Sequence, residues 1–162
     1  MTRRRAAQGA IGLLLAMLTS AGAATADDRH AGYYYPESVT TETYVARAKV
    51  LAETNRTRRI GFVVALTQAL FNRPYPPQFS AFVKGDAAEK LIIVALEDGY
   101  INTLYRARAL LAQMTSVART TPLFAELGVE DEYVFFDMLR LLGFEQLTIS
   151  DGESFAHQVQ FE

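Results

Sequence analysis

The chain has 162 residues, of which 50% are hydrophobic and 21% are charged, and its formal net charge is −2 at pH 7. These values are typical of a globular protein, and they exclude a disordered chain and a protein with many membrane spans. The chain has no cysteine, so disulfides, thiolate metal sites and a cysteine nucleophile are excluded as well.

The first 26 residues have the layout of a secretory signal peptide. Residues 3–5 are all arginine, an apolar stretch covers residues 10–18, and Ala24-Thr25-Ala26 has small residues at the −3 and −1 positions of a cleavage site. The apolar stretch is shorter than the roughly 20 residues that span a bilayer, which favours a signal peptide over the alternative of a membrane anchor. We therefore predict cleavage near Ala26 and a periplasmic or secreted protein without a membrane span. The export route, Sec or Tat, is left open.

Removal of the signal peptide changes the charge of the protein. Residues 1–26 hold three of the 16 basic residues and none of the 18 acidic ones, so the net charge goes from −2 to 13 − 18 = −5. Binding of nucleic acid relies on a basic surface, so we expect no nucleic-acid partner. The remaining 162 − 26 = 136 residues are enough for one domain with its own core.

The mature chain is expected to begin with an irregular arm over residues 27–40, followed by one domain over residues 41–162. The arm contains Tyr33, Tyr34 and Tyr35, which are candidates for contact with a partner. The alternative is that these rings pack across the edge of the domain's own core. Residues 43–51 alternate between apolar and polar side chains and predict a strand. A helix that begins at Thr41 is the alternative there.

The middle of the chain predicts one helix and two strands. Residues 60–71 have the spacing of a helix capped near Thr54 or Asn55, although a strand also fits part of this pattern. Strands are expected at residues 79–83 and 91–96, around a turn at residues 84–86. The second strand is apolar on both faces, which is typical of an interior strand that is covered on both sides.

The last third of the chain predicts helices followed by a hairpin. One helix is expected over residues 103–118, and a short one between Thr121-Pro122 and Gly128. A third helix is expected over residues 130–142. Residues 145–161 predict a β-hairpin with its turn at Asp151-Gly152. Together these elements predict an α+β domain, with a mainly antiparallel sheet of about five strands and helices packed on one face.

Four polar residues near predicted turns are candidate site residues: Asp98, Asp151, Ser154 and His157. The last three contain the residue types of a hydrolase triad. However, residues three apart in a strand face opposite sides, which separates Ser154 from His157, and no G-x-S-x-G motif surrounds the serine. We therefore assign no catalytic residue, and we expect His157 to be hydrogen bonded near the edge of the core.

No cofactor and no metal site are expected. The chain has only two histidines, too few for a histidine-rich zinc site. After cleavage His30 falls at the fourth position of the mature chain, whereas the amino-terminal copper motif needs histidine at the third. The sequence also lacks a calcium-binding D-x-D-x-D-G loop and the glycine-rich loops that bind phosphates.

Several segments resemble a family of small exported alphaproteobacterial proteins of unknown function. They are YYYPE (33–37), RRIGFVVALT (58–67), NRPYPPQF (72–79), EKLIIVALEDG (89–99), TLYRARALLAQMTSVARTTP (103–122) and LGFEQLTISDGESFAHQV (142–159). Some members carry the label "molybdopterin-guanine dinucleotide biosynthesis protein A", so the resemblance implies a link to molybdenum cofactor. The cytosolic nucleotidyltransferase of that name has an L-A-G-G-x-S-x-R-x-G loop, which has no counterpart in this chain.

Three hypotheses for function follow. The first is an exported, non-enzymatic domain that binds or scaffolds a periplasmic protein. The second is a small enzyme whose site is assembled only in three dimensions, from residues such as Asp98, Asp151, Ser154 and His157. The third is the role linked to molybdenum cofactor that the family label implies.

Overall fold

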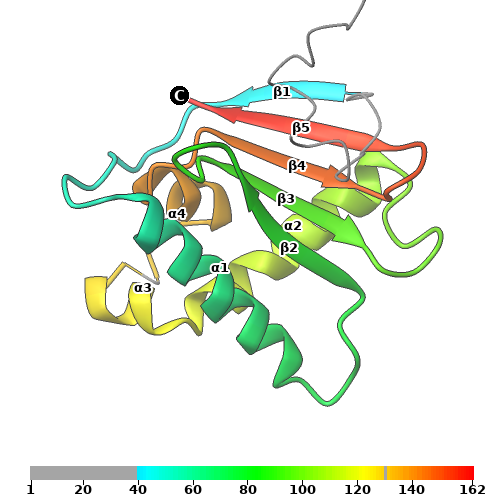
Figure 1. Cartoon of the computed structure of the whole chain (residues 1–162), viewed down its shortest axis with the longest axis horizontal. Coiled ribbons are helices and arrows are strands. Elements are labelled where there is room, and N and C mark those ends of the chain that lie inside the picture. The colour runs from blue at the N-terminus through cyan, green and yellow to red at the C-terminus, as the bar shows by residue number, and fades with distance from the viewer. Residues whose placement is uncertain (1–39, 130) are drawn as a thin grey trace, which may run out of the picture. The chain divides into compact units, whose positions relative to one another are not determined.

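A five-stranded sheet organises residues 40–129 and 131–162, which are the residues that the computed structural model describes (Figure 1). The predicted signal peptide, its cleavage site and the three consecutive tyrosines lie outside these residues. The strands are β1 (Thr40–Tyr44), β2 (Phe79–Lys84), β3 (Lys90–Ala95), β4 (Gln146–Ser150) and β5 (Ala156–Phe161). The helices are α1 (Arg56–Phe71), α2 (Leu104–Arg119), α3 (Pro122–Leu127) and α4 (Phe135–Leu141).

The strands lie in the order β1-β5-β4-β3-β2. The two hairpins, β2–β3 and β4–β5, are antiparallel, whereas β3–β4 and β1–β5 are parallel. The chain between β3 and β4 passes through three helices, and a parallel pair needs such a crossover connection. The α+β class and the sheet of five strands are therefore confirmed, but two of the four strand pairs are parallel where mainly antiparallel pairing was expected.

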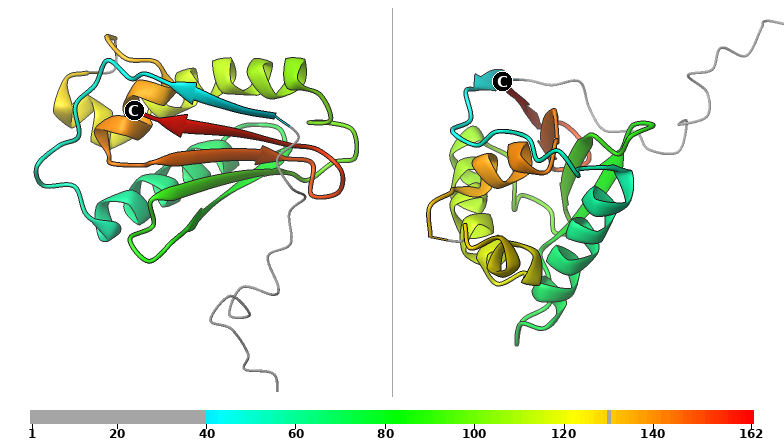
Figure 2. Two further views of the ribbon diagram at one scale, coloured as in Figure 1. Left: turned by 90° about the horizontal axis from the view of Figure 1, so that it is seen from above. Right: turned by 90° about the vertical axis from the view of Figure 1, so that its left-hand side faces the viewer.

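The four helices pack on one face of the sheet, as predicted (Figure 2, right). Strand residues two apart share a face, so one set of alternating side chains points at the helices. This set includes Leu91, Ile93, Leu147, Ile149, Val159 and Phe161, all of which belong to the core. The predicted strand at residues 91–96 is β3 (Lys90–Ala95), and it is an interior strand because it lies between β2 and β4. Cover on both of its faces was also expected, but the four helices all lie on one face.

The ends of α1 and α3 follow the predicted signals, and the start of α2 has a side-chain cap that was not predicted. The Asn55 side chain accepts a hydrogen bond from the Arg58 N–H (3.0 Å) at the start of α1. At the start of α2 the Thr103 hydroxyl accepts from the Arg106 N–H (3.3 Å). Pro122 is the first residue of α3, and Gly128 ends that helix in the left-handed conformation, with φ of 63°. Side-chain caps satisfy amide groups that the helix itself leaves without partners.

The first strand lies earlier than predicted. It spans Thr40–Tyr44, so residues 45–51 are neither the predicted strand nor the alternative helix, and Thr40 belongs to the sheet and not to the arm. Pairing with β5 explains the boundary. Tyr44 lies opposite Phe161, and the Ala46 N–H bonds to the carbonyl of Glu162, the last residue (2.9 Å). The pairing of β1 with β5 stops at Tyr44 and Phe161, where both strands end.

The last helix is shorter than predicted. α4 begins at Phe135, and its N-cap is Val134, so residues 131–134 precede the helix. The acidic side chain in its first turn is Asp137, which accepts a hydrogen bond from the Val134 N–H (3.3 Å). This contact fixes the helix start, because a carboxylate is stabilised at a helix N-terminus. Within residues 40–129 and 131–162, no helix has the length and apolarity needed to cross a membrane.

Candidate functional site

His157 is the second residue of β5, and only 1% of its surface is exposed. Both ring nitrogens have partners on the neighbouring strand β1. Nδ1 lies 2.7 Å from the Thr40 hydroxyl oxygen, and Nε2 lies 3.1 Å from a carboxylate oxygen of Glu42. His157 is hydrogen bonded, as expected, but it is almost fully buried where a place near the edge of the core was expected, and its partners were not suggested by the sequence.

The register of β1 against β5 brings these three side chains together. Thr40 lies opposite His157, and Glu42 lies opposite Val159. Because strand residues two apart point to the same side, Thr40 and Glu42 both face the helix layer, where they flank the imidazole. A shift by one residue would turn both side chains to the other face of the sheet.

Glu42 is also held by α2. A guanidinium nitrogen of Arg108 lies 3.1 Å from the second carboxylate oxygen of Glu42, and the two side chains are 61% and 33% exposed. A carboxylate accepts hydrogen bonds and does not donate them, so in a neutral imidazole Nε2 carries the proton and Nδ1 accepts from the Thr40 hydroxyl. We call Thr40, His157, Glu42 and Arg108 the histidine relay.

The other candidate residues do not join the relay. Asp151 and Ser154 lie in the turn between β4 and β5, where one Asp151 oxygen accepts from the N–H groups of Glu153, Ser154 and Phe155, each at 2.9 Å. The other oxygen accepts from the Ser154 hydroxyl (3.1 Å). Asp98 is exposed in the connection between β3 and α2. The structure thus pairs Asp151 with Ser154 and separates both from His157.

The electrostatics of Asp151 match this structural role. Partial burial by itself would raise the pKa of the carboxyl group. The hydrogen bonds from the three backbone N–H groups and from the Ser154 hydroxyl act in the opposite direction, and the pKa of Asp151 lies below its usual value. The turn therefore stabilises a charged carboxylate whose acceptor positions are occupied by its own loop.

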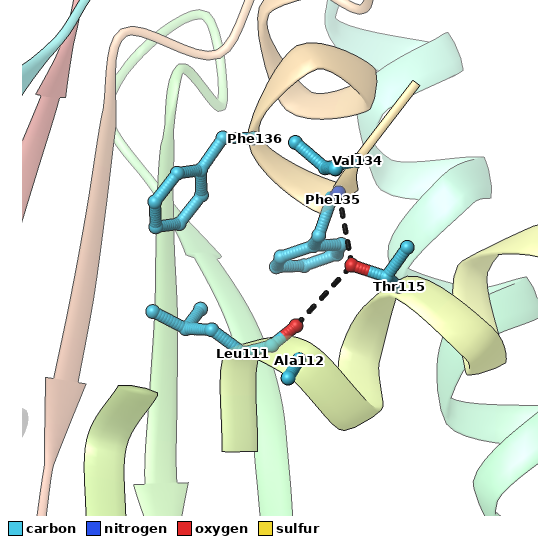
Figure 3. A pocket seen from close by; sticks show the side chains of 6 residues that line it. All are labelled: Leu111, Ala112, Thr115, Val134, Phe135 and Phe136. Atoms are coloured by element: carbon cyan, nitrogen blue, oxygen red, sulfur yellow. Dashed lines mark hydrogen bonds between the residues drawn. The ribbon is translucent and has the colours of Figure 1, made fainter. Parts of the chain in front are cut away.

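An apolar hollow of about 200 Å³ opens between α2 and the start of α4. Figure 3 shows its lining residues, which are Leu111, Ala112, Thr115, Val134, Phe135 and Phe136. The one polar side chain among them, Thr115, accepts from the Phe135 N–H (3.2 Å) and donates to the Leu111 carbonyl (3.4 Å). The hydroxyl therefore both donates and accepts a hydrogen bond within the protein, and the hollow offers an apolar surface to a ligand. We call this site the α2–α4 hollow.

The relay and the hollow are neighbours along two elements. On β1, Tyr44 follows Glu42 on the same face, and its ring contacts Phe136 in the wall of the hollow (centroids 4.8 Å apart). On α2, Ala112 lies one turn after Arg108, about 6 Å along the helix. The histidine relay and the α2–α4 hollow are therefore adjacent along both β1 and α2.

Sequence reasoning missed three of the four relay residues. The alternation of Thr40, Glu42 and Tyr44 is compatible with a strand. However, Thr40 was assigned to the arm, and the strand was expected to begin only at residue 43. Nothing local indicates that Arg108 approaches Glu42, because 66 residues separate them. Among the described residues, no group of three or more histidine, aspartate and glutamate side chains is placed to hold a metal ion.

No protein-family model, curated protein or solved structure matches the chain. The resemblance to small exported proteins therefore stays a prediction from the sequence, and the function has to be argued from the geometry.

Proposed function

We propose that the chain is an exported periplasmic domain that binds a protein partner, and that the α2–α4 hollow receives a side chain of that partner. The observation that supports this proposal is that the hollow is open and apolar, and that its polar groups are already hydrogen bonded within the protein. Part of the lining is itself exposed at the surface, because Val134 is 40% exposed. Exposed apolar surface of this kind is typical of interaction sites.

The size of the hollow favours a partner's side chain over a free small molecule. Sites for drug-sized ligands usually enclose about 300–1,000 Å³, whereas this hollow has about 200 Å³. An apolar or aromatic side chain inserted into such a hollow is the usual anchor of a protein interface. The turn residues Asp151 and Ser154, which are the polar alternative from the sequence, have their groups committed to each other.

Site-specific photo-cross-linking tests this proposal. A photoreactive residue in place of Ala112 should give one discrete adduct in periplasmic extract. The same residue in place of Ser116, which is exposed on the next turn of α2, should give none. Ala112→Glu should prevent the partner from co-purifying, since a charge in an apolar hollow is costly to bury, whereas Ser116→Glu should have no effect. Equal adducts at both positions would contradict the proposal.

The same preparation tests export. If the signal peptide is cleaved after Ala26, the protein recovered from the periplasm begins at Asp27. A protein that remains in the cytoplasm with its first residues intact would contradict export and leave the hollow to be explained by a cytoplasmic partner.

A further inference from the structure

We propose that the histidine relay is an acyl-transfer site in which Thr40 is the nucleophile, and that its substrates are carboxylic esters with an apolar acyl group. This inference goes beyond partner binding, because it needs the Thr40 hydroxyl and the His157 imidazole, which partner binding does not use.

Thr40, His157 and Glu42 lie in the geometry that activates a hydroxyl nucleophile. A hydroxyl nucleophile is activated when a base accepts its proton and a third group orients that base. The Thr40 oxygen lies 2.7 Å from Nδ1 of His157, and Glu42 lies 3.1 Å from Nε2. Both separations are within hydrogen-bonding distance. The carboxylate would also stabilise the imidazolium that forms when the ring takes the proton.

The residues of the relay differ in burial. The His157 ring is 1% exposed, so its orientation is held by the protein and costs little to maintain. Thr40 is half-buried on the edge strand β1, and Glu42 is 33% exposed. The nucleophile and the orienting acid therefore reach the surface, while the base between them is fixed. Preorganisation of this kind is what an acid–base catalyst requires.

The α2–α4 hollow offers an apolar surface for the acyl group of the substrate. From Thr40, β1 leads past Glu42 to Tyr44, whose ring touches Phe136 in the wall of the α2–α4 hollow. The four residue steps from Thr40 to Tyr44 cover about 13 Å along β1. A short acyl group therefore stays at the relay, whereas a longer one extends along β1 toward the hollow. The lining of the hollow is apolar, which favours an alkyl or aromatic acyl group over a charged one.

The reaction balances without a cofactor. The Thr40 oxygen attacks the ester carbonyl carbon as its proton moves to Nδ1 of His157. The bond to the alcohol breaks, and the alcohol leaves with that proton. Water then attacks the acyl-threonine ester and gives a proton to Nδ1, and the Thr40 oxygen leaves and takes the proton back. Ester and water become carboxylic acid and alcohol.

The test uses the full chain with p-nitrophenyl acetate and p-nitrophenyl palmitate, whose sixteen-carbon acyl chain is long enough to extend from Thr40 to the hollow. We expect release of p-nitrophenol with an initial burst, and an acyl adduct on the peptide that contains Thr40 by mass spectrometry. Thr40→Val should remove the adduct and lower the rate by about 10²-fold or more, while Thr40→Ser should retain both. Thr43→Val, on the same strand but exposed on its other face, should behave like the unmodified protein.

Two further variants separate chemistry from binding and from folding. His157→Gln should lower the rate constant of acylation for both esters, whereas Ala112→Glu should raise KM for the palmitate, and KM for the acetate should not change because the acetyl group does not reach the hollow. Circular dichroism and the Tm show whether each variant is folded. If folded wild-type protein hydrolyses neither ester, or if folded Thr40→Val retains the adduct, the proposal is overturned and the relay only fastens β1 to β5. If the Thr40→Val variant still forms the cross-linked adduct at Ala112, the partner-binding proposal stands whether or not the acyl-transfer proposal is overturned.

Discussion

The carboxylate of Asp137, in the first turn of α4, accepts three hydrogen bonds from Arg47, the third residue after β1. The backbone N–H of Arg47 lies 2.9 Å from one oxygen, and two guanidinium nitrogens lie 3.1 and 2.7 Å from the other. The Asp137 side chain is fully buried, whereas that of Arg47 is 62% exposed. A segment near the start of the domain is thereby attached to a helix near its end.

Asp137→Asn should destabilise the protein by about 1–3 kcal/mol, because the buried amide oxygen cannot replace a carboxylate that accepts from Arg47, Tyr44 and Val134. Urea denaturation followed by circular dichroism measures the effect. Asp131→Asn is the matched control, since Asp131 is exposed in the segment before α4, and it should change the free energy of unfolding little. Equal effects of the two substitutions would contradict the role assigned to Asp137.

The pH dependence of this effect has a defined sign. Burial alone would raise the pKa of Asp137, but the hydrogen bonds from Arg47 and from the Val134 N–H outweigh it, and the pKa lies below its usual value. The unfolded chain therefore binds this proton more readily than the folded protein. The stabilisation is complete above about pH 4, the unfolded pKa, and is lost as the pH falls through the lower folded pKa. The difference in the free energy of unfolding between the wild type and Asp137→Asn should therefore decrease as the pH falls through this range.

Asp151→Ala should loosen the turn between β4 and β5. The substitution removes the acceptor for three backbone N–H groups and the Ser154 hydroxyl, and loss of a comparable cap costs about 1 kcal/mol. Hydrogen exchange at the amides of residues 153–155 should accelerate. Glu153→Ala, at the exposed neighbouring position, is the control and should leave exchange unchanged. If Asp151→Ala leaves these amides protected, the carboxylate does not order the turn.

Arg59→Lys should lower the Tm although the charge is kept. The buried guanidinium donates to three carbonyl groups, those of Ala87, Leu142 and Gly143. The single ammonium nitrogen of a lysine cannot reach all three carbonyl oxygens. Unsatisfied buried carbonyls cost about 1–3 kcal/mol. Arg56→Lys, exposed in the first turn of the same helix, is the matched control. A Tm that falls equally in both variants would point to helix propensity as the cause.

Two glycines should respond to alanine in opposite directions. Gly143 has φ of 77°, and a Cβ there would lie 2.8 Å from a guanidinium nitrogen of Arg59 and 2.9 Å from Thr54, so Gly143→Ala should destabilise. Gly61 lies in α1 with open space around it, so Gly61→Ala should stabilise by about 0.5–1 kcal/mol. Thermal unfolding of both variants measures the difference, and a stabilised Gly143→Ala would show that the backbone there adapts.

Local features of the fold follow from local sequence. The cap Asn55, the proline that opens α3 and the turn at Asp151-Gly152 each depend on residues only a few positions apart, and all were found where predicted. The two errors in element boundaries occurred where distant contacts decide. β1 ends where its partner strand β5 ends, and α4 begins where Asp137 meets Val134 and Arg47.

The sequence by itself determined the α+β class, the hairpins and the ends of α1 and α3, because hydrophobic periodicity and capping act over a few residues. Only the tertiary structure decided which polar residues meet. His157 has Thr40 and Glu42 as partners across 117 and 115 residues, and this pairing depends on β1 lying parallel to β5 in one register. No local pattern encodes that register, since it results from the pairing of two strands that are far apart in the sequence.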